Sequence, residues 1–156
     1  MHLLPALVLT LLVLAGCQSE RIVYQEKQSV EDIAWEYGEQ LGFDFDVTDT
    51  ARSYRLELEI THTTDFQWEN IYLQIVTDYP TDASRTDVVS FELSAPDGTW
   101  YGKCRRGQCT VRIPLQQNVS FRHPGIHRLS FEQYMREEQL FGIEALRLRL
   151  VRLPEG

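Results

Sequence analysis

Residues 54–61 read Tyr54-Arg55-Leu56-Glu57-Leu58-Glu59-Ile60-Thr61. Every second residue is apolar and the residues between them are polar, which is the period of a β-strand with one buried face and one solvated face. A helix would instead place its apolar residues three and four positions apart. This segment therefore predicts a strand, and its alternation is repeated along most of the chain.

Six further segments alternate in the same way, and a short strand is also predicted at residues 21–25. The six are residues 41–47, 71–75, 89–93, 111–115, 129–131 and 146–150. Turn-forming residues separate them, as in Pro96-Asp97-Gly98 and Pro124-Gly125. Because one sheet would not cover so many apolar rows, the pattern predicts an all-β fold, a two-sheet antiparallel β-sandwich.

Charged residues occupy the outward positions of two predicted strands. Glu57 and Glu59 alternate with the apolar residues of 54–61, and Arg147 and Arg149 alternate with the leucines of 146–150. If these strands are neighbours, the two rows match and form cross-strand ion pairs. We expect that pairing on the outer face of one sheet.

The N-terminus has the pattern of an export signal. Residues 3–15 are apolar and would span about 20 Å as a helix, too short for a hydrocarbon layer of about 30 Å. Small residues then lead to a cysteine in Leu14-Ala15-Gly16-Cys17, which resembles a bacterial lipobox. The resemblance implies cleavage before Cys17 and its lipidation, including palmitate. The alternative is an ordinary signal peptide with a coincidental cysteine.

These features divide the chain into three parts. Residues 1–16 are expected to be a signal peptide, residues 17–28 a lipidated polar tether, and residues 29–156 the β-sandwich domain. The formal net charge of −8 disfavours nucleic acid as a partner, and membrane attachment is expected through the lipid anchor. Gln18, rather than an aspartate, follows Cys17, which resembles lipoproteins of the outer membrane.

Two cysteines remain after Cys17 is assigned to lipid. Cys104 and Cys109 would lie in an oxidising compartment and are predicted to form a disulfide. Free thiols and a metal site are the alternatives. If the pair staples a hairpin, Arg105 and Arg106 lie at its tip, either as part of a solvated loop or as a contact for an acidic partner.

The sequence contains no recognisable catalytic motif and no cofactor-binding motif. Asp44, Asp46 and Asp49 have calcium-like spacing, but a solvated strand face is the preferred interpretation, and no metal site is predicted. His123 and His127 alone do not make a zinc site. A hydrolase would need facing carboxyl groups, for example Glu57 or Glu59 with Glu132 or Asp97. We therefore predict that the protein is not an enzyme.

Aromatic residues supply the remaining candidates for contacts. Tyr72 lies out of phase with its apolar neighbours and should point outward. Asp97 forms a Pro-Asp-Gly turn that leads into Trp100 and Tyr101, so this turn is a candidate contact site, unless Trp100 only closes one end of the sandwich. Exposed aromatic side chains suit a protein partner or, as the alternative function, a carbohydrate.

The order and spacing of several motifs resemble the gliding-motility lipoprotein GldH family of the Bacteroidota. They are Trp35, residues 43–50, 52–56, 70–73 and 96–102, Pro124-Gly125, and above all Glu132-Gln133-Tyr134-Met135-Arg136, Leu140-Phe141-Gly142-Ile143 and residues 146–150. The Cys104–Cys109 segment departs from that pattern. No catalytic residue is carried over from the family.

The resemblance implies a cell-envelope lipoprotein tied to gliding and to the type IX secretion apparatus. Its partners would be other envelope lipoproteins or components of the secretion and motility machinery. In a host of that phylum, Asp49-Thr50-Ala51 also resembles an O-glycosylation acceptor, which would modify Thr50.

Overall fold

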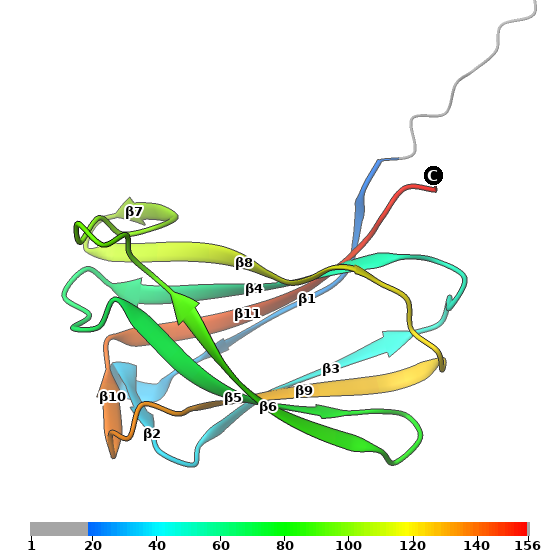
Figure 1. The fold of residues 1–156 in the computed structure, drawn as a ribbon, viewed down its shortest axis with the longest axis horizontal. Coiled ribbons are helices and arrows are strands. Elements are labelled where there is room, and N and C mark those ends of the chain that lie inside the picture. Colours follow the sequence, from blue (N-terminus) through cyan, green and yellow to red (C-terminus); the bar gives the residue numbers. More distant parts are fainter. Residues whose placement is uncertain (1–18, 156) are drawn as a thin grey trace, which may run out of the picture.

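The computed structural model describes residues 19–155, in which two antiparallel β-sheets are stacked face to face (Figure 1). The all-β sandwich predicted from the sequence is confirmed. In chain order the elements are β1 (Arg21–Ser29), the 3-10 turn η1 (Glu31–Ile33), β2 (Ala34–Glu36), β3 (Gln40–Val47), β4 (Tyr54–Thr63), β5 (Asn70–Asp78), β6 (Ser84–Glu92), β7 (Lys103–Arg105), β8 (Gln108–Val119), β9 (Gly125–Gln133), β10 (Gln139–Phe141) and β11 (Ile143–Arg152).

The larger sheet has five strands in the order β1-β11-β4-β8-β7. Its central strands β4 and β11 turn Leu56, Leu58 and Ile60, with the leucines of β11, toward the other sheet, and all of these side chains are buried. The strand predicted at residues 21–25 is present and continues to Ser29 along β11. Residues 21–28, expected to be part of a tether, therefore belong to this sheet.

The smaller sheet has four strands in the order β3-β9-β5-β6. Its inward rows contribute Phe43, Phe45 and Phe131 together with Ile71 and Leu73, all almost completely buried. These side chains meet the leucine rows of the larger sheet, as expected for two sheets packed face to face. The alternating pattern of the sequence thus accounts for the core between the sheets.

A short two-stranded sheet, β10-β2, closes one end of the core. Trp35 of β2 pairs with Leu140 of β10, and both side chains are buried. The indole Nε1 of Trp35 donates a hydrogen bond to the carbonyl of Glu39 at 3.0 Å, which satisfies its polar group. This sheet holds the segment around β10 against the end of the sandwich.

The start of β1 and the C-terminus lie at one end of the sandwich, and β2 and β10 lie at the other (Figure 1). Arg21, at the start of β1, pairs with Arg152 near the C-terminal end of the described chain. β1 then runs nine residues, or about 30 Å, toward η1 and β2. Figure 1 shows the start of β1 and the C-terminus at one end, with β2 and β10 at the other. Within residues 19–155 no helix is long and apolar enough to cross a membrane.

Candidate functional site

The charged rows of β4 and β11 lie side by side, as the sequence predicted. Glu59 faces Arg147 and Glu57 faces Arg149 in the register of the two strands. The Nη1 atom of Arg149 is 3.1 Å from Glu57 Oε2 and 3.5 Å from Glu59 Oε1. Arg112 of β8 approaches Glu59 Oε1 to 2.6 Å. We call this set the arginine–glutamate network; it comprises Arg55, Glu57, Glu59, Arg112, Arg147 and Arg149.

The network is far more enclosed than a solvated sheet face. Glu57 is 7% exposed, Glu59 is 8% exposed and Arg149 is 9% exposed, because the long flanking arginines cover the carboxylates. Glu132, by contrast, lies on β9 beside the inward-facing Phe131, and so on the outer face of the other sheet. The structure therefore does not bring Glu132 together with Glu57 or Glu59 as a pair of catalytic carboxyl groups.

The predicted disulfide is present between Cys104 and Cys109. The two residues are paired across the β7–β8 hairpin, with Arg106 and Gly107 in left-handed conformation at its tip. Both Arg105 and Arg106 are exposed. The tip is also held from the side, since the hydroxyl group and the backbone N–H of Thr64 donate to the Gly107 carbonyl.

In the segment of the Pro-Asp-Gly turn, Asp97 and Trp100 have structural roles. Asp97 accepts a hydrogen bond from the backbone N–H of Thr99 at 2.9 Å, and this bond lowers the pKa of the Asp97 carboxyl group. Trp100 packs partly against the core, and its indole Nε1 donates to the Thr64 carbonyl at 3.2 Å. Trp100 therefore helps to close the end of the sandwich, whereas Tyr101 is exposed.

Several exposed aromatic and apolar side chains gather at the end that carries β2 and β10. Tyr72, predicted to point outward, is exposed, and its carbonyl accepts the backbone N–H of Tyr134. The backbone N–H of Tyr37 donates a hydrogen bond to the carbonyl of Glu138, just before β10. We call this region the aromatic end; its exposed side chains are Ile33, Tyr37, Trp68, Tyr72, Tyr134 and Phe141.

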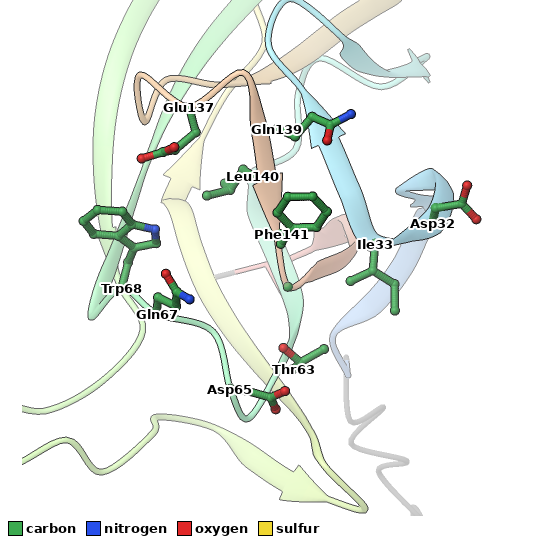
Figure 2. Close-up of a pocket in the computed structure, with 11 residues that line it drawn as sticks. Asp32, Ile33, Thr63, Asp65, Gln67, Trp68, Glu137, Gln139, Leu140 and Phe141 are labelled. Carbon is green, nitrogen blue, oxygen red and sulfur yellow. The ribbon is translucent and has the colours of Figure 1, made fainter.

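A pocket of about 430 Å³ lies within the aromatic end, between η1, β10 and the loop that follows β4 (Figure 2). Phe141 stands in the middle of the view, with Trp68 and Glu137 on one side and Ile33 on the other. Phe141 is 64% exposed and Trp68 is 41% exposed. We call this site the Trp68 pocket; its charged and amide side chains are Asp32, Asp65, Glu137, Gln67 and Gln139.

Backbone conformation fixes the rim of the Trp68 pocket. Asp32 and Ile33 both have positive φ, at 50° and 57°, and this conformation is costly for a β-branched residue. The Ile33 carbonyl accepts the N–H of Gly142. Gly142 itself has φ of 99°, and a Cβ atom there would lie 3.0 Å from the ring of Phe66. A glycine is therefore required where β10 turns into β11.

A second hollow, of about 760 Å³, lies on the open side of the sandwich between β6 and β8. Its lining is mainly apolar and comes from both sheets. His127 lies there against Phe45 and Phe121, and burial lowers the pKa of its imidazole. Its Nδ1 atom is 3.1 Å from the Gly125 carbonyl, so His127 belongs to the packed interior, whereas His123 is exposed.

The remaining polar candidates lie on β3 and in the turn that follows it, where Asp44 and Asp49 interact with other residues of the chain. Asp44 and Asp46 share the outer face of β3, as expected, and Asp44 pairs with Arg128 at 3.0 Å. Asp49 accepts the N–H of Ala51 in the following turn. Thr50 is exposed in that turn. Among residues 19–155 no three His, Cys, Asp or Glu side chains are grouped as metal ligands. Cys17, the predicted lipidation site, lies outside the described residues, as does the signal peptide.

Comparison with known proteins identifies the family. The model of the GldH lipoprotein family matches residues 22–150. The gliding motility lipoprotein GldH homolog of Christiangramia forsetii is 24% identical over 140 residues, covering 89% of this chain and 85% of that protein. The gliding motility lipoprotein GldH of Flavobacterium johnsoniae is 26% identical over 141 residues, covering 90% of this chain and 86% of that protein.

Among solved structures, a family GH115 4-O-methyl-alpha-glucuronidase with specificity for decorated arabinogalactans matches with a TM-score of 0.46 and 14% identity. The match covers 83% of this chain but only 17% of that much longer chain. The family match instead covers nearly the whole sandwich, from β1 to β11. The chain therefore belongs to the GldH lipoprotein family.

Proposed function

We propose that this protein is a non-enzymatic, lipid-anchored component of the gliding-motility and type IX secretion machinery. It acts through contacts with other envelope proteins, and its anchor lies in the outer membrane. The family match supports the envelope and motility context. The observation that carries the proposal of protein contacts is the aromatic end, where the exposed side chains of Ile33, Trp68 and Phe141, from three separate segments, line one pocket. Such a patch is typical of protein-binding surfaces.

The direction of β1 supports the same proposal. An anchor on Cys17 would enter the fold at Arg21, at the end of the sandwich opposite β2 and β10. The length of β1 then places the aromatic end about 30 Å from that attachment point. The lipid would hold one end at the membrane, while the aromatic end faces outward toward neighbouring proteins.

Carbohydrate binding remains the second candidate, and one observation favours it. One side of the Trp68 pocket carries both the exposed indole ring of Trp68 and the amide group of Gln67 (Figure 2). An aromatic face next to hydrogen-bonding side chains suits a sugar ring. Titration with a neutral sugar would separate this function from protein contacts.

Site-specific photo-crosslinking in native cells tests the proposal of protein contacts. A photoreactive residue at Phe141 of the aromatic end is compared with one at Ile126, which is also an exposed apolar position but lies near the opposite end. We expect discrete crosslinks to envelope proteins from position 141 and not from position 126. Equal labelling at the two positions, or none at either, would contradict the proposal.

Palmitate labelling tests the anchor separately. The wild-type protein should take up label and fractionate with the outer membrane, and the Cys17→Ala variant should do neither. A wild-type protein without label would refute the lipid anchor while leaving the crosslinking result to stand by itself.

A further inference from the structure

We propose that the Trp68 pocket binds the guanidinium group of an arginine, presented by a basic segment of a protein partner. This inference rests on the proposed function, because it names the chemistry that the partner offers to the aromatic end. The observations that carry it are the charge of the pocket, its exposed aromatic faces and its size.

The pocket has an uncompensated negative charge. Asp32, Asp65 and Glu137 are among its lining residues, and no Lys, Arg or His is. Glu137 lies on the same side of Phe141 as Trp68, whereas Asp32 lies on the other side (Figure 2). Within residues 19–155, no ion-pair partner of 4 Å or closer is present for any of these three carboxylates. Because the sandwich supplies no countercharge here, a cationic group from outside is the complementary ligand.

The aromatic side chains suit a planar cation. Trp35 and Trp100 donate their indole N–H groups to backbone carbonyls at 3.0 Å and 3.2 Å. Trp68 makes no such hydrogen bond within the described residues; the residue is 41% exposed, and Glu137 lies on the same side of the pocket (Figure 2). A guanidinium group can stack on an indole face while its N–H groups reach a neighbouring carboxylate, here that of Glu137, which an ammonium group does less well.

The size and floor of the pocket fit one long side chain. Its volume of about 430 Å³ is too small for a folded segment. Leu140 forms the buried part of the lining, and Ile33 and Phe141 supply apolar surface for the methylene groups of an arginine. A neutral sugar would stack on the indole ring but would leave the neighbouring Glu137 carboxylate without a countercharge.

Nuclear magnetic resonance of the indole N–H signals tests the inference directly. The full chain, solubilised in a neutral detergent with labelled tryptophan, gives separate signals for Trp35, Trp68 and Trp100. N-acetyl-arginine amide is titrated against N-acetyl-citrulline amide, its neutral counterpart of nearly the same shape. We expect the arginine probe to shift the Trp68 signal and to bind more weakly as salt is raised, with citrulline having little effect.

Three variants locate the interaction. Glu137→Gln should weaken arginine binding about threefold, as expected for a partly exposed ion pair. Asp65→Asn should weaken it less, because Asp65 lies farther from Trp68 (Figure 2). Asp46→Asn removes an exposed carboxylate far from the pocket and should leave the affinity unchanged. Trp68→Leu should abolish binding, and unchanged Trp35 and Trp100 signals in this variant would show that the fold is intact.

Each other outcome overturns the inference. Equal shifts with arginine and citrulline would identify a neutral hydrogen-bonding site, and shifts with glucose or galactose alone would identify a carbohydrate site. An unmoved Trp68 signal would exclude ligand binding of this class. If crosslinks from position 141 persist while the arginine probe fails, the proposed function stands and only the ligand chemistry is wrong.

Discussion

Two regions of this protein combine carboxylates with apolar surroundings, and they differ in the source of the countercharge. In the arginine–glutamate network, Glu57 and Glu59 are covered by arginines from β4, β8 and β11. In the Trp68 pocket, Asp32, Asp65 and Glu137 have no cation among the lining residues. The carboxylates of the network thus have their countercharge within the fold, whereas those of the pocket do not.

The difference follows from how the two regions are built. Antiparallel register places residues of neighbouring strands opposite each other, so a row of glutamates beside a row of arginines pairs without further help. The pocket is instead assembled from η1, β10 and a loop, which meet at one end of the sandwich. This contrast indicates that the network stabilises the sheet, whereas the pocket is available to a ligand.

Neutralising one carboxylate in each region should give the largest difference in the free energy of unfolding. Glu57→Gln removes the closer of the two carboxylates that contact the buried Arg149 and leaves Glu59 as the one carboxylate of the network, so we expect a loss of about 3 kcal/mol in the free energy of unfolding. Glu137→Gln should leave stability nearly unchanged. Urea denaturation followed by tryptophan fluorescence measures both. Equal losses for the two variants would mean that the network is not a distinct stabilising unit.

Removing the disulfide should have a smaller effect, confined to the hairpin beside the aromatic end. The Cys104→Ser/Cys109→Ser double variant opens a short loop, and the chain-entropy model gives a loss of about 2 kcal/mol. The wild-type protein with reductant provides the control and should behave like the variant. A stability that is insensitive to reductant would show that the hairpin is held chiefly by its backbone pairing and by Thr64.

The dependence of stability on pH near neutrality should come from two buried histidines and not from the exposed carboxylates of the pocket. Burial lowers the pKa of both His62 and His127 in the folded state. The unfolded chain therefore binds protons more readily, so stability is full above about pH 6.5 and falls as pH is lowered through the depressed folded pKa values. Each histidine contributes a slope of at most about 1.4 kcal/mol per pH unit.

Denaturation at a series of pH values measures this slope. Replacing His127 with Gln should reduce it, while replacing the exposed His123 with Gln should have a smaller effect, because burial is the larger cause of the lowered His127 pKa. A slope that is unchanged in the His127 variant would mean that this imidazole is not protonated more readily on unfolding.

The regular part of this fold could be predicted from the sequence because it depends on a period of two. The rows of β4 and β11 follow that period without interruption, so their inward leucines and their outward charges were both predicted, including the pairing of Glu57 and Glu59 with Arg147 and Arg149. The depth of burial of these charges was not predicted. It depends on arginines from neighbouring strands lying over the carboxylates, which no single segment shows.

The Trp68 pocket was not predicted, for a related physical reason. Ile33 and Phe141 are apolar residues that a pattern assigns to the core, yet three-residue elements such as η1 and β10 have no period to establish a face. The Leu140-Phe141-Gly142 segment contained the available signal, because glycine after an aromatic residue marks a turn in the backbone. Ile33 and Phe141 are nevertheless exposed in the structure, where the backbone has positive φ at Ile33 and at Gly142.

The smallest expected effect on stability is at Phe141, and it separates a binding role from a structural one. Phe141 is 64% exposed, whereas its neighbour Leu140 is buried against Trp35. We expect Phe141→Ser to change the free energy of unfolding by less than about 0.5 kcal/mol, as for exposed positions in general. Leu140→Ser should cost several times more, because it places a hydroxyl group in the core. Thermal unfolding of the two variants makes the comparison, and a large loss at Phe141 would mean that its ring completes the fold and has not been left exposed for a partner.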